Sequence, residues 1–271
     1  MWEPNNIVKQ GRGEGAAAAN KPNVTMVRSE DVLARPTRDA NGVKMTGDYV
    51  LKPGAKMFTV YMTPSKQVKN YTTDGDEDME TIKQKFEGSI PGDQLAAAEF
   101  VQNMMGVDVE IIAANCVDAY KRVYGTPCSP MKLKAEQTDD SSGRMTKLVF
   151  EQIVGSKYVP AFYEGNLVYG APTASDESVD VTVANGEQYQ LEAFALGETI
   201  DIASTDRVAG DVITFIGGGG ADPGAVSTGD HTAAKVLLVD GTDWTALEDA
   251  TITFKVFDDG TDTYFIEQNR T

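Results

Sequence analysis

The sequence predicts a mainly β protein with two β-sandwich or barrel domains and one flanking α-helix. Residues 93 to 105 have apolar residues at helical spacing, whereas most other apolar residues alternate in short runs typical of strands. The composition also changes sharply near residue 171. We therefore expect an N-terminal arm over residues 1 to 48, a β domain carrying the helix over residues 49 to 170, and a C-terminal β-sandwich over residues 171 to 271.

Charge divides the chain in the same way. The 271 residues include 24 Lys and Arg against 41 Asp and Glu, a net charge of −17. Residues 1 to 170 hold 20 basic and 22 acidic residues, whereas residues 171 to 271 hold 4 and 19. Because phosphate backbones are held by clustered Lys and Arg, we expect the acidic C-terminal domain to repel nucleic acid.

Cysteine content and hydropathy favour a soluble protein made in a reducing cytoplasm. Cys116 and Cys128 are the two cysteines, so we expect free thiols or at most one bridge. The first residues lack the apolar core of a signal peptide, and the sequence has no apolar run of about 18 residues for a membrane helix.

The first 48 residues are rich in glycine, alanine and proline, and only residues 24 to 27 favour a strand. Two interpretations remain open. The segment is either a disordered tail or an arm that adds a strand to an exposed sheet edge of a neighbouring subunit.

A polar stretch follows a predicted strand over residues 49 to 63, and we expect it to form an acidic loop. Its carboxylates are Asp74, Asp76, Glu77, Asp78 and Glu80. The first aspartates match the ligand spacing of an EF-hand, but Met79 stands at its glycine position and Lys85 at its final glutamate position. We therefore expect no calcium site and interpret these acidic residues as a solvated loop or as candidate contacts between subunits.

The predicted helix has recognisable ends and one apolar face. Asp93 is expected to cap its N-terminus and Gly106 to end it. The apolar face comprises Ala97, Phe100, Val101, Met104 and Met105. Because nearly all of the surrounding sequence indicates strands, this face is expected to pack against a β-sheet.

Several strands are predicted after the helix. Residues 107 to 113 begin with alternation and end as a continuous apolar run, which favours a strand entering the core. Residues 121 to 124 and 131 to 137 are spaced like a hairpin, and a turn over residues 139 to 143 precedes a long strand over residues 144 to 154.

Two hairpins of the C-terminal domain have a register that follows from their apolar faces. A three-residue loop over residues 184 to 186, with its glycine in the left-handed conformation, would pair Val181 with Tyr189. The same register pairs Val179 with Leu191. The closing hairpin is predicted across an odd-numbered loop centred on Gly260. Its apolar faces would be Ile252, Phe254 and Val256 on one strand and Tyr264 and Ile266 on the other.

Motifs for catalysis or cofactor binding are weak throughout. The glycines at 217 to 220 lack the Lys-Ser/Thr of a phosphate loop and are expected to form a flexible surface loop. His231 is the one histidine, so a zinc site with several imidazoles cannot form. A Cys–His pair would combine residues of two predicted domains, and no Gly-x-Ser-x-Gly motif is present. We expect no enzyme activity, no cofactor and no metal.

Several segments resemble, in their order and composition, the tail tube subunits of long-tailed bacteriophages. Between residues 86 and 165 these segments are FEGSIPGD, DVEIIAANC, YKRVYGTPCSP, TKLVFEQ and VPAFYEG. The closing stretch, DGTDWTALEDATITFKVFDDGTDTYFIEQNR, is similar to the ends of many phage tail and baseplate appendage domains.

The resemblance implies a structural virion protein of the phage tail. Two packed β-sheets with a flanking helix would form the tube domain, six copies would close into a ring, and stacked rings would form a tube that conducts DNA. The implied partners are further copies of the chain and other tail proteins, with DNA passing through without specific binding and no membrane partner. The acidic C-terminal domain would lie outside the tube.

Two other functions remain in view. A capsid-decorating or head-to-tail joining protein would also use an arm and a β domain. A carbohydrate-binding or adhesion module would rest on Trp244 with Tyr264, because a tryptophan beside a turn can stack on a sugar. An isolated tryptophan in a turn is, however, more often a packing anchor.

Overall fold

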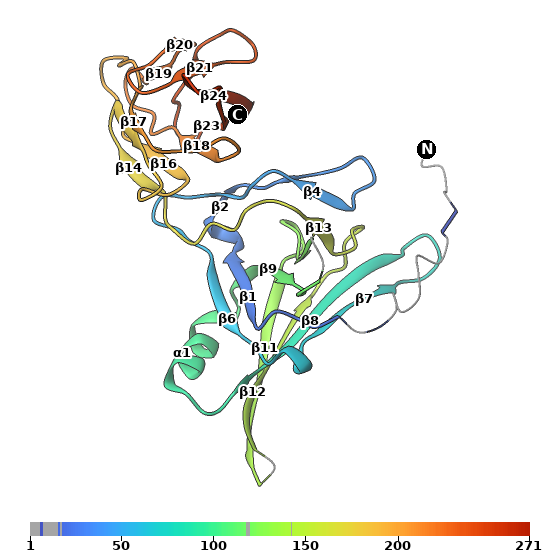
Figure 1. The fold of residues 1–271 in the computed structure, drawn as a ribbon. Coiled ribbons are helices and arrows are strands. Elements are labelled where there is room, and N and C mark those ends of the chain that lie inside the picture. Colours follow the sequence, from blue (N-terminus) through green and yellow to red (C-terminus); the bar gives the residue numbers. More distant parts are fainter. Residues whose placement is uncertain (1–5, 8–15, 17, 118–119, 142) are drawn as a thin grey trace. The chain divides into compact units, whose positions relative to one another are not determined.

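The computed structural model describes residues 6–7, 16, 18–117, 120–141 and 143–271 and has a mainly β fold with one α-helix among them (Figure 1). This confirms the predicted fold class. Contacts between residues divide the chain into two compact units, the first ending at residue 167 and the second containing residues 168–271. Residues 50–56 belong to the second unit, which the sequence did not indicate.

The first unit is built on one 11-stranded sheet within the described residues. Its strand order is β3-β4-β13-β10-β9-β11-β12-β8-β7, and β1 pairs with both β6 and β9. The strands of this unit are β1 (Asn23–Arg28), β2 (Val32–Ala34), β3 (Thr37–Arg38), β4 (Lys44–Thr46), β6 (Phe58–Tyr61), β7 (Val68–Asp74), β8 (Thr81–Pro91), β9 (Asp108–Ala114), β10 (Lys121–Tyr124), β11 (Met131–Asp140), β12 (Gly143–Gln152) and β13 (Ala161–Tyr163). Its helix is α1 (Leu95–Met104), and two short 3-10 turns span Ser29–Asp31 and Pro64–Lys66.

Strand β1 lies inside the chain's own sheet, between β6 and β9. This differs from the expected arm on a neighbouring subunit. Val24, Met26 and Val27 are buried because β1 is a central strand with both faces covered, the position in which a continuous apolar run is stable. Residues 1–5, 8–15 and 17 of the expected arm lie outside the described residues.

Strands β10 and β11 do not form the hairpin that their spacing suggested. Both pair with β9, on the edge opposite β1, and both run antiparallel to it. The turn residues between them form a small excursion in which Thr126 and Ser129 exchange backbone hydrogen bonds. Gly125 has a φ of 97° at its start. Gly125, Pro127 and Pro130 therefore interrupt the pairing along β9 between β10 and β11, but the chain continues in the same direction.

Helix α1 covers part of the core of the first unit. It is shorter than predicted, because Gln94 occupies the N-cap position and makes no side-chain cap bond. Asp93 instead accepts a hydrogen bond of 3.0 Å from the Gln137 amide, so its predicted capping role is wrong. Gly106, with a φ of 80°, follows the helix end as expected. Met105 was expected on the buried face but is 64% exposed, because it lies just beyond the last helical residue.

The core of the first unit combines side chains from α1 and from strands on both sides of β9. It contains Val24, Met26, Val60, Met62, Phe86, Ile90, Ala97, Met104, Val109, Ile111, Ala113, Tyr124, Met131, Leu133, Leu148 and Phe150. Phe100 and Val101 of the helix pack against this cluster. The predicted packing of the helix on a sheet is therefore confirmed.

The second unit is a β-sandwich with its own core. A seven-stranded sheet has the order β14-β16-β18-β23-β24-β21-β20, and β15 pairs with β17 in a separate two-stranded sheet. The strands of this unit are β5 (Val50–Leu51), β14 (Thr173–Ser175), β15 (Ser178–Val181), β16 (Gln188–Leu191), β17 (Asp201–Thr205), β18 (Val212–Ile216), β19 (Ala225–Val226), β20 (Gly229–Asp230), β21 (Lys235–Leu237), β22 (Trp244–Thr245), β23 (Thr251–Asp258) and β24 (Thr263–Arg270).

The predicted hairpin between β15 and β16 is wrong. Strand β15 pairs in parallel with β17, and β16 pairs in parallel with β14 and β18. Val179, Val181, Tyr189 and Leu191 nevertheless share one buried cluster. Residues 182–187, none of which is buried, therefore connect strands of two different sheets. Alternation predicts which face of a strand is buried but not which strand lies beside it. Gly186 has the expected left-handed conformation, with a φ of 84°.

The closing hairpin forms, but its register differs by one residue from the prediction. Val256 is opposite Phe265, and Phe257 is opposite Tyr264. The buried face of β24 therefore carries Phe265 and Glu267, and Tyr264 and Ile266 lie on the outer face. Apolar alternation alone does not predict this register, because one of the buried positions on β24 is a glutamate, Glu267.

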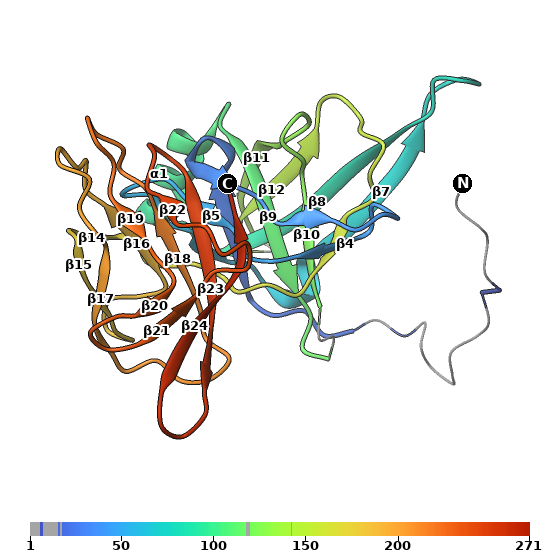
Figure 2. The ribbon, with the colours of Figure 1, turned by 90° about the horizontal axis from the view of Figure 1, so that it is seen from above.

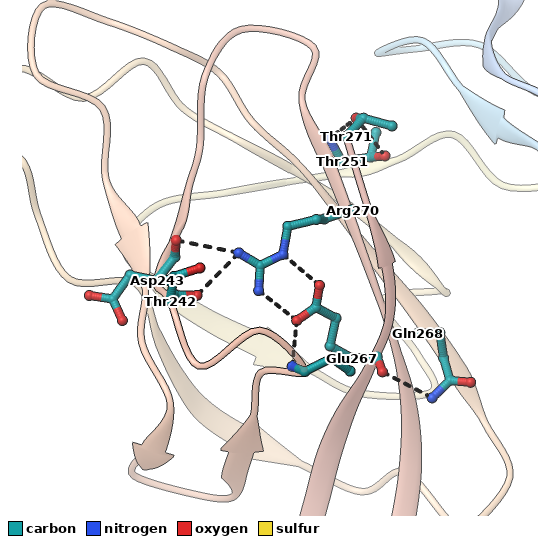
Figure 3. A network of polar contacts seen from close by, with 8 residues as sticks. Thr242, Asp243, Thr251, Glu267, Gln268, Arg270 and Thr271 are labelled. Carbon is teal, nitrogen blue, oxygen red and sulfur yellow. Dashed lines mark hydrogen bonds and ion pairs between the residues drawn. The ribbon is translucent and has the colours of Figure 1, made fainter.

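Glu267 is held in its buried position by Arg270 (Figure 3). The guanidinium donates to both carboxylate oxygens, at 2.5 and 2.6 Å, and to the carbonyl oxygens of Thr242 and Asp243. The Val239 amide donates a further hydrogen bond of 2.9 Å to Glu267. These contacts fasten the segment after β21 to the last strand.

At glycines 217 to 220 the backbone passes very close to two other backbone segments, and we call this place the glycine crossing. The expectation of a flexible surface loop is therefore wrong. A Cβ atom on Gly217 would collide with the Leu247 carbonyl oxygen, and one on Gly218 with the Leu191 carbonyl oxygen. The Gly219 amide donates to the Ala246 carbonyl at 2.9 Å, and its own carbonyl accepts from the Phe194 amide at the same distance. Backbones approach here to distances that only glycine permits.

Candidate interaction surface

The predicted acidic residues lie at the tip of the β7–β8 hairpin (Figure 1, Figure 2). Asp74 is the last residue of β7 and is paired with Thr81, so it belongs to the strand and not to the loop. Its carboxylate lies 2.6 Å from the Lys83 ammonium. The hydrogen bond from Lys83 lowers the pKa of Asp74 below its usual value.

The other four predicted acidic residues occupy the turn itself and are exposed. They are Asp76, Glu77, Asp78 and Glu80. Gly75 has a φ of 122° and Asp78 a φ of 70°, and the Met79 amide donates to the Asp76 carbonyl at 2.9 Å. Within the described residues no ion pair involves these four carboxylates. The turn thus displays unpaired negative charge on a constrained backbone.

Strand β7 is an open sheet edge that the sequence analysis missed. It lies at one end of the strand order, and among the described residues β8 is its one partner strand. Val68 is 49% exposed and Tyr71 is 47% exposed. Residues 68 to 74 were interpreted as part of a polar loop, because Lys69, Asn70 and Asp74 interrupt the β-favouring valine, tyrosine and threonines of this segment.

Strand β11 provides a second open edge. Its first residues pair with β9, but from Leu133 onward β12 is its one partner within the described chain. Every residue from Lys134 to Asp140 is exposed. The β11–β12 hairpin extends away from the rest of its unit (Figure 1).

Between these two edges lies the four-stranded segment β11-β12-β8-β7, whose outer face carries paired charges. Glu87 lies 2.6 Å from Lys85 and 3.0 Å from Lys147. A hydrogen bond from Lys85, followed in size by one from Lys147, lowers the pKa of Glu87 below its usual value. Lys134 forms an ion pair with Glu151 on the same face. The lysines of this face are therefore largely matched by carboxylates.

The residues considered for chemistry occupy structural or isolated positions. Cys116 and Cys128 are free and exposed. The His231 ring is buried, with Nε2 3.0 Å from the Ser227 carbonyl oxygen and Nδ1 3.3 Å from the Asp201 carboxylate. Within the described residues no three His, Cys, Asp or Glu side chains form a group that could hold a metal ion.

Trp244 is 2% exposed and belongs to the core of the second unit, so its ring is not available to stack on a sugar.

No family model, curated protein or solved structure matches the chain. In the part of the chain that the structure describes, no helix is long and apolar enough to cross a membrane.

Proposed function

We propose that this protein is a structural subunit of a phage tail tube. Copies of the chain join into rings of six, and the rings stack into a tube through which DNA passes without specific binding. The mainly β fold of the first unit, with one helix packed on its sheet, agrees with the architecture that the sequence resemblance implies. Other tail proteins would be its further partners in the virion.

The observation that carries this proposal is the pair of open edges on one four-stranded segment. Strand β7 forms one edge of the segment β11-β12-β8-β7, and the free part of β11 forms the other edge. Exposed edges present unpaired backbone amides and carbonyls, which pair readily with another strand. Neither strand contains a proline, and the one lysine on each edge, Lys69 on β7 and Lys134 on the free part of β11, is bound to another side chain, Asn115 and Glu151 respectively. This segment therefore offers two places for a neighbour's strand.

Two different edges favour a head-to-tail assembly. If β11 of one copy pairs with β7 of the next, every copy still offers one free edge on each side. Such heterologous contacts continue until the rotation between copies closes a ring, or until an open filament forms. Closure would place the charge-paired face of the segment on one wall of the ring. Lysines already paired with carboxylates bind phosphate backbones weakly, which suits a tube that does not retain DNA.

Electron microscopy of the purified full-length chain tests the proposal. We expect rings or stacked tubes in negative stain. Tyr71→Lys places a charge on the β7 edge and Ala135→Lys places one on the free part of β11, and each should abolish rings because charged side chains protect edges from pairing. Leu196→Lys, at a residue of the second unit that is 81% exposed, is the matched control and should assemble like the wild type.

The same images address the alternative roles in the virion. Monomers or trimers at every concentration would contradict the tail tube proposal and favour a capsid-decorating or head-to-tail joining protein.

A further inference from the structure

The outer face of the seven-stranded sheet in the second unit carries a row of aromatic and aliphatic side chains that are exposed or half-buried. Phe257 on β23 lies opposite Tyr264 on β24, and Tyr264 lies beside Lys235 on β21. In the next row Ile266 lies beside Leu237. Phe257 is 50% exposed and Leu237 is 44% exposed, although both belong to regular strands. We call these five residues the aromatic face.

The two rings form one platform near the hairpin tip. Their centroids are 6.2 Å apart and their planes are inclined by 48°. Neither ring inserts into the core, which is filled by Phe254, Val256 and Phe265 from the other side of the same strands. Phe257 is exposed and Tyr264 is half-buried, so part of this apolar surface stays in contact with solvent within the described residues.

Fixed polar groups surround this platform. The Lys235 ammonium lies 2.6 Å from the Asp262 carboxylate and 5.8 Å from the centre of the Tyr264 ring. A hydrogen bond with the Asp259 carboxylate raises the pKa of the Tyr264 hydroxyl. Donors and acceptors therefore lie at the border of an aromatic surface.

The hairpin loop that supplies these carboxylates is held by its own side chains. Asp258 accepts a hydrogen bond of 2.6 Å from the Gly260 amide. Asp259 accepts from the amides of Thr261 and Asp262, both at 2.9 Å. A site whose polar groups are already fixed loses less conformational entropy when a ligand binds.

We propose that the aromatic face binds a neutral oligosaccharide. A sugar ring has apolar C–H faces that pack on aromatic rings and a rim of hydroxyls that need both donors and acceptors, and this face offers both. The surrounding charge restricts the ligand class. Residues 171 to 271 carry 4 basic and 19 acidic residues, so nucleic acid and acidic glycans are repelled.

A second copy of the chain fits this surface less well. The centres of protein–protein interfaces are depleted in Lys and Asp, whereas here Lys235 and Asp262 lie beside the central tyrosine. The site also differs from the one that the sequence suggested. Trp244 is buried, and Phe257 takes the place beside Tyr264 that the tryptophan was expected to fill.

Binding of the full-length chain to defined oligosaccharides tests this inference independently of tube formation. The probes are hexamers of glucose and of N-acetylglucosamine as neutral ligands and oligosialic acid as the acidic comparison, displayed on a glycan array. Phe257→Ala and Tyr264→Ala should each weaken binding about tenfold, the size expected for the loss of one aromatic contact. Leu247→Ala, at another exposed residue of the second unit, should bind like the wild type.

Each outcome decides the assignment. Binding of a neutral hexamer that is lost in both aromatic variants, with unchanged thermal unfolding, supports it. The absence of binding to every neutral glycan, or binding that survives both substitutions, overturns it. Self-association that Phe257→Ala abolishes would assign the face to a second copy of the chain instead. Failure to form rings, in contrast, bears only on the proposed function.

Discussion

Glu267 is a buried carboxylate on the last strand, β24. Its side chain is 4% exposed, and Arg270 supplies two of its hydrogen bonds. Removing the guanidinium would leave a buried carboxylate without its charged donor, and hydrogen bonds to charged groups contribute about 1.5 to 3 kcal/mol. We predict that Arg270→Ala lowers the free energy of unfolding of the second unit by about 2 kcal/mol.

Urea titration followed by tryptophan fluorescence measures this change. Trp2 and Trp244 are the two tryptophans, so a Trp2→Phe background makes the buried Trp244 the reporter of the second unit. The control is Lys235→Ala in the same sheet, whose ion pair with Asp262 is exposed on both sides. Exposed ion pairs contribute little to stability. Equal destabilisation by both substitutions would contradict a special role for the buried pair.

The same pair makes the second unit sensitive to acid. Hydrogen bonds from Arg270 lower the pKa of Glu267 from its usual value of 4.5. A carboxyl group whose pKa is lowered by folding stabilises the fold above its unfolded pKa, and this contribution disappears as the pH falls through the folded value. We predict that the stability of the wild type declines below about pH 4.5 partly for this reason.

Glu267→Gln isolates the effect of this one group. The variant should be less stable than the wild type near neutral pH, and the difference should shrink as the pH falls toward 3. Urea titrations between pH 3 and 7 measure it. Glu248→Gln, at an exposed residue, should follow the wild type throughout. Parallel curves for Glu267→Gln and the wild type would mean that Glu267 does not titrate as proposed.

At the scale of the element, the clearest stability prediction concerns the glycine crossing at residues 217 to 220 of the second unit. A Cβ atom on Gly218 would meet carbonyl oxygens of Leu191 and Glu192, which are backbone atoms that cannot rotate away. Overpacking a rigid site costs about 1 to 3 kcal/mol, so Gly218→Ala should lie at the upper end of that range. Among the described residues, nothing lies within 4 Å of a Cβ on Gly170, which makes Gly170→Ala the matched control.

Thermal unfolding of the two variants in the Trp2→Phe background tests this packing. A clear loss for Gly218→Ala beside little change for Gly170→Ala is the expected result. A Gly218→Ala variant that melts with the wild type would mean that the segment is loose, as its four consecutive glycines first suggested.

Elements were predictable from the sequence where local signals decide them. Gly106 ends the helix through its left-handed conformation, and the apolar run after it forms the buried strand β9. The partners of the strands were not predictable in the same way. Val181 and Tyr189 are buried in one core as expected, but they belong to strands of two different sheets. Sequence alternation carries no information on that choice.

At the scale of the whole molecule, the interaction surface could be predicted only in part. The acidic turn was recognisable because five carboxylates lie within seven residues of sequence, from Asp74 to Glu80. The open edges of β7 and β11 were not, because an edge is defined by the absence of a neighbour in three dimensions. The polar residues that suit an exposed edge also resemble those of a loop.

The two open edges allow a test of how copies join. Under head-to-tail pairing, Tyr71→Lys blocks β7 but leaves β11 available, and Ala135→Lys does the reverse. Each variant alone should remain monomeric. A mixture in equal amounts should form one junction between the intact β11 of the first variant and the intact β7 of the second. The dimer then stops growing because both outer edges are blocked.

Native mass spectrometry measures this outcome directly, because the two variants differ in mass and a mixed dimer is distinguished from either homodimer. A two-fold contact between identical edges would behave differently. If β7 paired with β7 of another copy, Ala135→Lys alone would form homodimers and mixing would add nothing. If neither variant forms dimers alone and mixed dimers form when the two are combined, the contact joins two distinct edges. In the wild type the same contact, repeated around a closed circle, would produce the ring.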